Sequence, residues 1–176
     1  MLGDSPEAPE AIARGSEVNI DGQADCNIAD DVISNYMRLV LDTDVIVAAL
    51  RSPTGASSAL LLAIDDGLAE LLATVPLFLE YEAVSHRPEH MLASGLRAAE
   101  LAMFFDRLVE LVVPVEAWFL WRPQLRDPAD EMVLEAAVNG QADALVTFNR
   151  RHFLPAAARF DLPVLLPGEI LMKVRK

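Results

Sequence analysis

The sequence predicts an α/β protein built on a mostly parallel, roughly five-stranded sheet with helices on both faces. Short apolar runs that suit buried strands alternate with longer segments in which apolar residues recur every three or four positions, as on a helix. Such alternation is typical of a parallel sheet. With 53% hydrophobic residues and a mean hydropathy of +0.28, the 176-residue chain can also bury a sizeable core.

The first 36 residues differ in composition from the rest of the chain. They contain eight acids, one arginine and only scattered apolar residues without a period. We therefore predict a mostly disordered extension over residues 1–36 and a folded domain over residues 37–176. Met37 stands directly before the first apolar run, so the extension is either an artefact of the gene model or a short tail that binds a partner.

The first half of the domain is expected to contain two strands and four helices. Pro53 and Gly55 separate the first two helices, Pro76 lies near the first turn of the third, and Ser94 is a suitable N-cap for the fourth and longest. In chain order we predict a strand at 39–41, helices at 45–50 and 56–64, a strand at 70–74, and helices at 76–86 and about 94–110.

The second half continues the alternation and is richer in strands. Gly140 follows a helical segment and is expected to end it. In chain order we predict a strand at 111–115, a loop at 116–126, a helix at 128–139, strands at 144–147 and 164–166, and a short last helix at 168–174.

Acidic and amide side chains stand where a parallel sheet would bring them together. Asp42 ends the first strand, Asp130 lies in an acidic cluster that opens the helix at 128–139, and Asn149 follows the strand at 144–147. Ligands of open α/β sheets bind outside the carboxyl ends of the strands. Carboxylates about 4 Å apart repel by roughly 4 kcal/mol, so such a cluster needs shared protons or a cation. Oxygen ligands favour Mg²⁺ or Mn²⁺.

Each candidate also has a structural explanation. Asp42 or Asp44 can be the N-cap of the helix that follows, and acids at the start of any helix complement its dipole. Glu80 and Glu82 lie two positions apart on a helix, so at most one of them faces a given cleft. Asn149 belongs to a residue type that is common in turns.

Composition excludes several other kinds of protein. The single cysteine, Cys26, excludes an internal disulfide framework and a thiolate zinc site, and a cytoplasmic setting is the expectation. No apolar run reaches the roughly 18 residues of a membrane helix. The net charge is −13, of which the first 36 residues carry seven negative charges. The remaining acidity argues against tight sequence-independent DNA binding.

These blocks together resemble the PIN-domain nucleases, in particular the VapC-related branch of toxin ribonucleases. The resemblance covers about residues 37–174. Its carriers are Leu39-Val-Leu-Asp42-Thr-Asp44-Val45, Leu79-Glu80-Tyr81-Glu82-Ala-Val, Asp127-Pro-Ala-Asp130-Glu131 and Ala142-Asp143-Ala-Leu-Val-Thr147-Phe-Asn149-Arg-Arg-His152-Phe153. The resemblance implies a three-layer α/β/α sandwich and divalent-metal-dependent cleavage of phosphodiester bonds, usually in RNA.

The resemblance also implies roles for individual residues. Four are expected to bind Mg²⁺ or Mn²⁺ and to be catalytic: Asp42, Glu80, Asp130 and Asn149. Secondary candidates beside them are Asp44, Glu82, Asp127, Glu131 and Thr147. Arg150 and Arg151 are expected to bind the RNA backbone. Asn149 is a departure, because many members of the family have aspartate there, and a carboxylate at Asp44 can partly offset it.

The expected function is therefore a metal-dependent endoribonuclease that acts as the toxin of a type II toxin–antitoxin pair. Its expected partners are RNA and a cognate antitoxin, with a homodimer as a further expectation and no membrane. Residues 115–121 can belong to such an interface or to the core. The alternative is a catalytically weakened PIN-like module that binds RNA or protein. A phosphoacceptor receiver domain is disfavoured because both lysines, Lys173 and Lys176, follow the last predicted strand.

Overall fold

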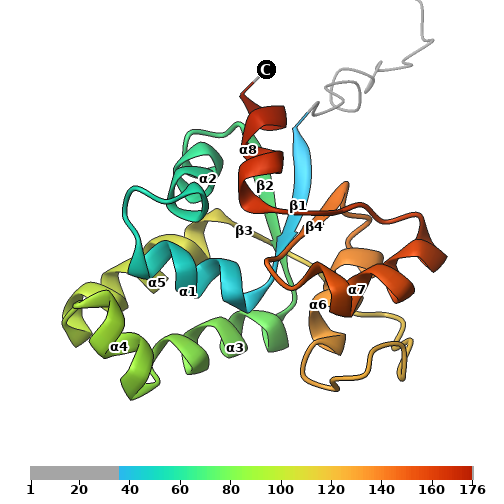
Figure 1. Ribbon diagram of the computed structural model, residues 1–176, viewed down its shortest axis with the longest axis horizontal. Helices are drawn as coiled ribbons and strands as arrows, with labels where there is room; N and C mark the ends of the chain where they lie inside the picture. Colours follow the sequence, from blue (N-terminus) through green and yellow to red (C-terminus); the bar gives the residue numbers. More distant parts are fainter. Residues whose placement is uncertain (1–35, 176) are drawn as a thin grey trace, which may run out of the picture. The chain divides into compact units, whose positions relative to one another are not determined.

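The computed structural model describes residues 36–175, and within them five strands form one sheet (Figure 1). The strand order is β3-β2-β1-β4-β5, and every neighbouring pair is parallel. The strands are β1 (Met37–Leu41), β2 (Ala69–Ala73), β3 (Val112–Pro114), β4 (Ala144–Val146) and β5 (Val164–Leu165). The predicted fold class is confirmed. The prediction for residues 1–36 falls, apart from Tyr36, outside the described residues.

Helices connect the strands and cover both faces of the sheet (Figure 1). They are α1 (Thr43–Arg51), α2 (Ala56–Asp65), α3 (Val75–Ser85), α4 (Pro88–Ser94), α5 (Ala98–Leu111), α6 (Glu131–Asn139), α7 (Arg150–Ala157) and α8 (Pro167–Val174), with a 3-10 turn at Ala158–Phe160. Parallel crossovers are right-handed. The helices between β1 and β3, which are α1 to α5, therefore lie on one face of the sheet. The helices between β3 and β5, which are α6 and α7, lie on the other.

The centre of the sheet positions the site. The inner residues of β1 and all of β4 are completely buried, which suits strands with apolar neighbours on both faces. The chain leaves β1 towards β2 on one side, while β4 pairs with β1 on the other. This is the topological switch point of the sheet, where open α/β proteins form their ligand clefts at the carboxyl ends of the strands.

Two helices, α5 and α6, begin later than predicted, and two others, α4 and α7, were not predicted. Ser94 does not begin the long helix: it ends α4, and Gly95 follows in the left-handed conformation (φ +70°). Pro88 begins α4 at a position where its missing N–H costs nothing. The long helix α5 begins at Ala98, where the Glu100 carboxylate accepts a hydrogen bond from the Arg97 backbone.

The other two differences lie beside the site. The helix predicted from residue 128 begins only at Glu131, because residues 128–130 form a turn in which the Asp127 carboxylate accepts a hydrogen bond from the Ala129 backbone. Helix α7 was not predicted, since its polar first turn and internal Pro155 hide the helical spacing of its buried residues. Those buried residues are Phe153, Ala156 and Ala157.

Among residues 36–175, no single helix has the length and apolar character needed to cross a membrane; α1 and α2 meet that test only as a pair bent by 101°.

Gly140 is expected to tolerate no side chain. A Cβ atom there would lie 2.7 Å from the Ala136 carbonyl oxygen and 2.9 Å from the Val115 Cγ2. We expect Gly140→Ala to lower the free energy of unfolding by about 1–3 kcal/mol through overpacking, as measured by urea denaturation. Gly168→Ala is the control, because its nearest contact would be an ordinary 3.9 Å. Equal stability of the two variants would contradict this packing.

Candidate functional site

A cleft of about 410 Å³ at the carboxyl edge of the sheet brings the four primary candidates together. Asp42 follows β1, Glu80 lies on α3, Asp130 precedes α6 and Asn149 precedes α7. Asp44, on the first turn of α1, lines the same cleft. Residues more than 100 positions apart in the chain therefore meet because parallel strands end at one edge.

Asp42 and Asp44 share one hydroxyl group. Asp42 is the N-cap of α1, and its Oδ1 accepts a hydrogen bond from the Thr43 backbone at 2.7 Å. The Thr147 hydroxyl lies 2.7 Å from Asp42 Oδ2 and 3.2 Å from Asp44 Oδ2. A hydroxyl has one proton and donates fully to only one carboxylate at a time. Asp44 Oδ2 also accepts a hydrogen bond from the Phe148 backbone at 3.0 Å, but its buried Oδ1 has no hydrogen-bond partner among the described residues.

Burial makes this pair costly to ionise. Asp42 is only 7% exposed. The pKa of Asp42 is raised to about 7, mainly by burial and to a smaller extent by the charge of Asp44. Burial also raises the pKa of Asp44, and it raises that of Asp130, where a hydrogen bond with His152 partly opposes it. The cleft therefore favours either bound protons or a cation.

The other two acidic primary candidates, Glu80 and Asp130, lie beside basic side chains. Glu80 lies 3.8 Å from Arg87, and Asp130 lies 3.3 Å from His152. The His152 ring also lies 2.7 Å from the Asn149 amide. Accordingly, no three His, Cys, Asp or Glu side chains within residues 36–175 stand close enough to hold one ion in this arrangement.

The donor set nevertheless fits a hard divalent cation. The candidates offer carboxylate and amide oxygens, which are the preferred ligands of Mg²⁺ and Mn²⁺. The unpartnered Asp44 oxygen and the raised pKa of Asp42 are the features that a cation would satisfy. For Glu80 and Asp130 to join Asp42, their side chains must turn away from Arg87 and His152.

The secondary candidates fall in different places. Thr147 is buried between Asp42 and Asp44, as described. Asp127 lines a neighbouring groove instead of the cleft. Glu82 is an exposed residue of α3 that lines neither space.

Glu131 is turned into the protein. Its carboxylate accepts hydrogen bonds from the backbone of Gln124 at 2.6 Å and of Leu125 at 2.8 Å. The side chain is buried and does not line the cleft. Glu131 therefore holds the loop before α6, and this structural role could not be distinguished by sequence from that of its neighbour Asp130.

The role of Glu131 gives a stability prediction. Glu131→Ala leaves two backbone N–H groups of the loop without an acceptor, and we expect a loss of about 1–3 kcal/mol in the free energy of unfolding. Urea denaturation measures this loss. Glu82→Ala on the exposed surface of α3 is the control and should stay within roughly 0.5 kcal/mol of the wild type. If the two variants unfold at the same urea concentration, Glu131 does not hold the loop.

The two predicted RNA-binding arginines lie apart. Arg150 is ion-paired with Glu169 at 3.3 Å and lines neither cleft nor groove. Arg151 lines the neighbouring groove, which has a volume of about 820 Å³ and shares Asn149 with the cleft. Arg126 lines this groove too and was missed in the sequence, because nothing in a loop's composition indicates where its side chains point.

Tyr81 is a second residue that sequence reasoning missed. It is completely buried, and its hydroxyl donates to the Leu41 carbonyl, directly before Asp42. Burial, followed by the charge of Asp42, raises the pKa of Tyr81 well above its ordinary value, so the phenol stays protonated. It thus fixes the end of β1 as a hydrogen-bond donor. The only sequence signal for Tyr81 is its position between Glu80 and Glu82 in a segment that resembles the family.

Comparison with known proteins identifies the family of the chain. A family model described as "PIN domain" matches residues 38–151, which include all four primary candidates. No curated protein matches the chain.

Proposed function

The chain belongs to the PIN-domain family, and on that premise we propose that it is a divalent-metal-dependent endoribonuclease of the VapC-like toxin branch. PIN domains are generally metal-dependent nucleases, and the fold described above is of this nuclease type. One observation carries the proposal. The buried Asp42 and the half-buried Asp44 share the Thr147 hydroxyl at the switch point of the sheet, and the Oδ1 of Asp44 has no hydrogen-bond partner among the described residues. This arrangement is costly without a cation.

Asp42, Glu80 and Asp130 would hold Mg²⁺ or Mn²⁺, with the amide oxygen of Asn149 and the free oxygen of Asp44 as further ligands. A bound divalent ion lowers the pKa of water and offsets charge on a phosphate. Thr147 orients the Asp42 carboxylate, and any proton shared by Asp42 and Asp44 must leave before both can be ligands. Hydrolysis would break the bond between phosphorus and the 3′ oxygen of RNA.

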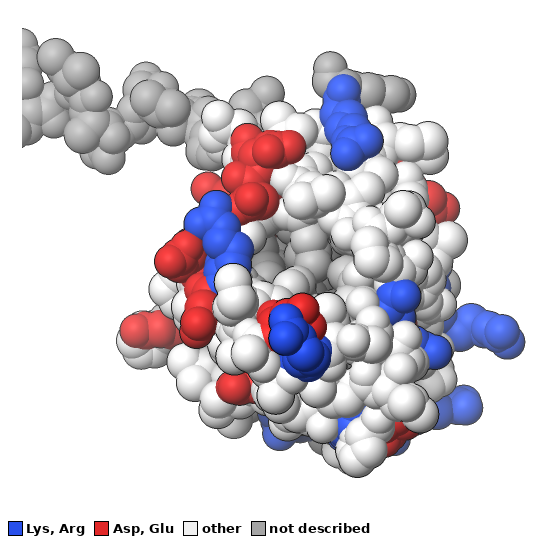
Figure 2. Space-filling model, turned by 90° about the vertical axis from the view of Figure 1, so that its left-hand side faces the viewer, with Lys and Arg blue, Asp and Glu red and all other residues white. Residues whose placement is uncertain are grey.

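The toxin role adds three proposals: a cognate antitoxin as partner, a homodimer, and a cytoplasmic setting. Residues 118–121 are exposed and do not belong to the core. One apolar surface supports a protein partner. An apolar hollow of about 320 Å³ lies between α1, α2 and α5, on the face shown in Figure 2, and Asp65 and Arg107 are the charged residues in its lining.

A second candidate function is a weakened PIN-like module that binds RNA without cutting it. Asn149 in place of a fourth acid favours this alternative, as does the pairing of Glu80 with Arg87 and of Asp130 with His152. In that case the cleft would bind a cation weakly and hold RNA through the basic groups near it.

Incubation of the full-length protein with mixed RNA, in Mg²⁺, in Mn²⁺ and in EDTA, separates the two functions. We expect cleavage with either metal and none in EDTA. RNA binding without cleavage under all three conditions would favour the binding module. Cleavage that persists in EDTA would contradict both candidates.

A further inference from the structure

The arginines without a carboxylate partner gather around the site. Six arginines of the described part have an Asp or Glu within 4 Å: Arg38, Arg87, Arg97, Arg107, Arg122 and Arg150. Of the others, Arg51 lines the acidic cleft, Arg126 and Arg151 line the 820 Å³ groove, and Arg159 donates to Gln124 in the wall of that groove. Only Arg175 lies elsewhere. Four of these five arginines therefore lie in or beside the cleft and the groove, and Asp127 is the one acid among the residues that line the groove.

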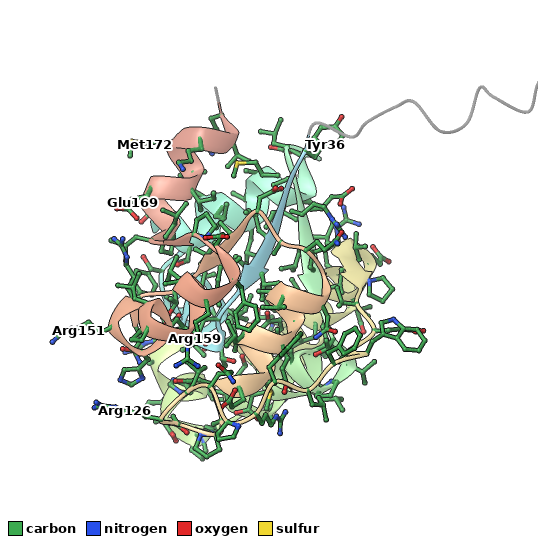
Figure 3. All side chains as sticks on the ribbon, turned by 90° about the vertical axis from the view of Figure 1, so that its right-hand side faces the viewer. Tyr36, Arg126, Arg151, Arg159, Glu169 and Met172 are labelled. Atoms are coloured by element: carbon green, nitrogen blue, oxygen red, sulfur yellow. The ribbon has the colours of Figure 1, made fainter. Side chains whose placement is uncertain are left out.

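The groove continues directly from the acidic cleft. The loop residues 124–128 form one wall, and the beginning of α7 forms the other. Figure 3 shows Arg126 and Arg151 extending from the same edge of the domain, one from each wall. Guanidinium groups that are not neutralised by a protein carboxylate are well suited to bind phosphates. An RNA strand that leaves the cleft along this groove would place its backbone between them.

The chain segment that leads into this loop carries three exposed aromatic side chains, Trp118, Phe119 and Trp121, which we call the aromatic ledge. They are 77%, 63% and 41% exposed. Gln124 connects the ledge to the groove, because its amide donates to the Trp121 carbonyl at 2.6 Å and accepts from Arg159 at 2.7 Å. Trp121 also packs against Phe160, the neighbour of Arg159, so this end of the ledge lies beside the groove wall.

Hydrogen bonds from α6 fix the backbone that carries the ledge. The Asn139 amide pairs with both the N–H and the carbonyl of Phe119, each at 3.0 Å. Arg122 makes two hydrogen bonds of 2.8 Å with the buried carboxylate of Glu135. Bidentate pairs of this kind fix geometry as well as adding stability. Large apolar side chains that are exposed on an anchored loop indicate a ligand surface.

We propose that the groove and the aromatic ledge bind single-stranded RNA that extends from the acidic cleft. Arg126 and Arg151 hold backbone phosphates, and the ledge stacks unpaired bases. Base faces are accessible only in unpaired RNA, whereas duplex bases stack on one another, so the ledge selects single strands. This inference rests on the proposed ribonuclease function and specifies its substrate.

The test is the binding of a fluorescent single-stranded RNA and of its duplex to the full-length protein, by anisotropy in EDTA, where metal-dependent cleavage is absent. The Arg126→Gln/Arg151→Gln double variant should bind the single strand about 10- to 100-fold more weakly, with a salt dependence smaller by roughly 1.4 in log–log slope. Phe119→Ala should weaken binding by about 5- to 100-fold, the loss of one stacked base.

Matched controls are Arg97→Gln, an exposed arginine of the N-cap of α5, and Met103→Ala, an exposed apolar residue of the same helix. Both should bind RNA like the wild type. Wild-type affinity in the double variant, or equal affinity of the wild type for duplex and single strand, would overturn the groove and ledge. If RNA cleavage in Mg²⁺ persists in that case, the proposed function survives without them. Wild-type affinity for the single strand in Phe119→Ala would overturn the role of the ledge.

Discussion

Asp42→Asn is expected to lower the rate of metal-dependent RNA cleavage by roughly a thousandfold or more. The same substitution should make the metal-free protein more stable at pH 8. The two effects have one cause. Asp42 is a buried carboxylate beside Asp44, which disfavours its charge in the absence of a cation. Asparagine removes that charge and is also a good N-cap, because its amide oxygen can still accept from the Thr43 backbone. Its NH2 group then faces the Thr147 hydroxyl as a donor, which leaves that hydroxyl free to donate to Asp44.

The size of the stabilisation follows from the pKa. Burial and Asp44 raise the pKa of Asp42 from 3.8 to about 7. The cost of keeping it ionised is then on the order of 4 kcal/mol at pH 8. Urea denaturation in EDTA measures the gain, and single-turnover cleavage in Mg²⁺ measures the loss. Asp106→Asn, an exposed residue of α5, is the control that should change neither. A variant at Asp42 that is inactive because it is unfolded would contradict the structural part of this prediction.

The metal-free wild-type protein is also expected to lose stability as the pH rises from about 4 to about 7. Asp42 has a higher pKa in the folded state than in the unfolded chain, so the folded protein binds more protons in this range. Stability therefore falls with rising pH, and the loss is complete above the folded pKa. Asp44 contributes in the same direction. Ionisation of acids remote from Asp42 affects the wild type and Asp42→Asn alike, so the difference between the two proteins reports on Asp42 and its neighbour Asp44.

This difference is measured by urea denaturation at pH 5 and pH 8 in EDTA. We expect Asp42→Asn to gain stability over the wild type mainly at pH 8. Mg²⁺ at a hundredfold excess over its dissociation constant should raise the free energy of unfolding of the wild type at pH 8 by about 2.7 kcal/mol. It should have little effect on the stability of the variant. An equal pH dependence of both proteins would show that the charge of Asp42 is not costly in the fold.

The strands and the meeting of the acids were predictable because both follow from short-range patterns. Three apolar residues before Asp42 indicate a buried strand, and parallel topology then places that aspartate at the edge where the chain after β4 also arrives. Helix boundaries were harder where local signals compete. Ser94 has good capping chemistry, but Gly95 can adopt the left-handed conformation that ends a helix, and it determines the boundary.

The direction of each side chain was not predictable. Asp130 and Glu131 are adjacent acids of similar chemistry, yet one lines the cleft and the other holds the backbone of the preceding loop. The difference arises from where the loop at 116–126 passes, which depends on long-range contacts such as that of Asn139 with Phe119. Arg126 belongs to the site for the same reason, and Arg150 is directed away by Glu169.

The most direct measurement is a Mn²⁺ titration of the full-length wild type and Asp42→Asn, followed by electron paramagnetic resonance, with RNA cleavage assayed on the same samples. The proposed site predicts that the wild type binds Mn²⁺ and cleaves RNA as the ion binds, whereas Asp42→Asn binds the ion far more weakly and does not cleave. Equal Mn²⁺ affinity and equal cleavage in the two proteins would contradict the assignment of this cleft as the metal-dependent site.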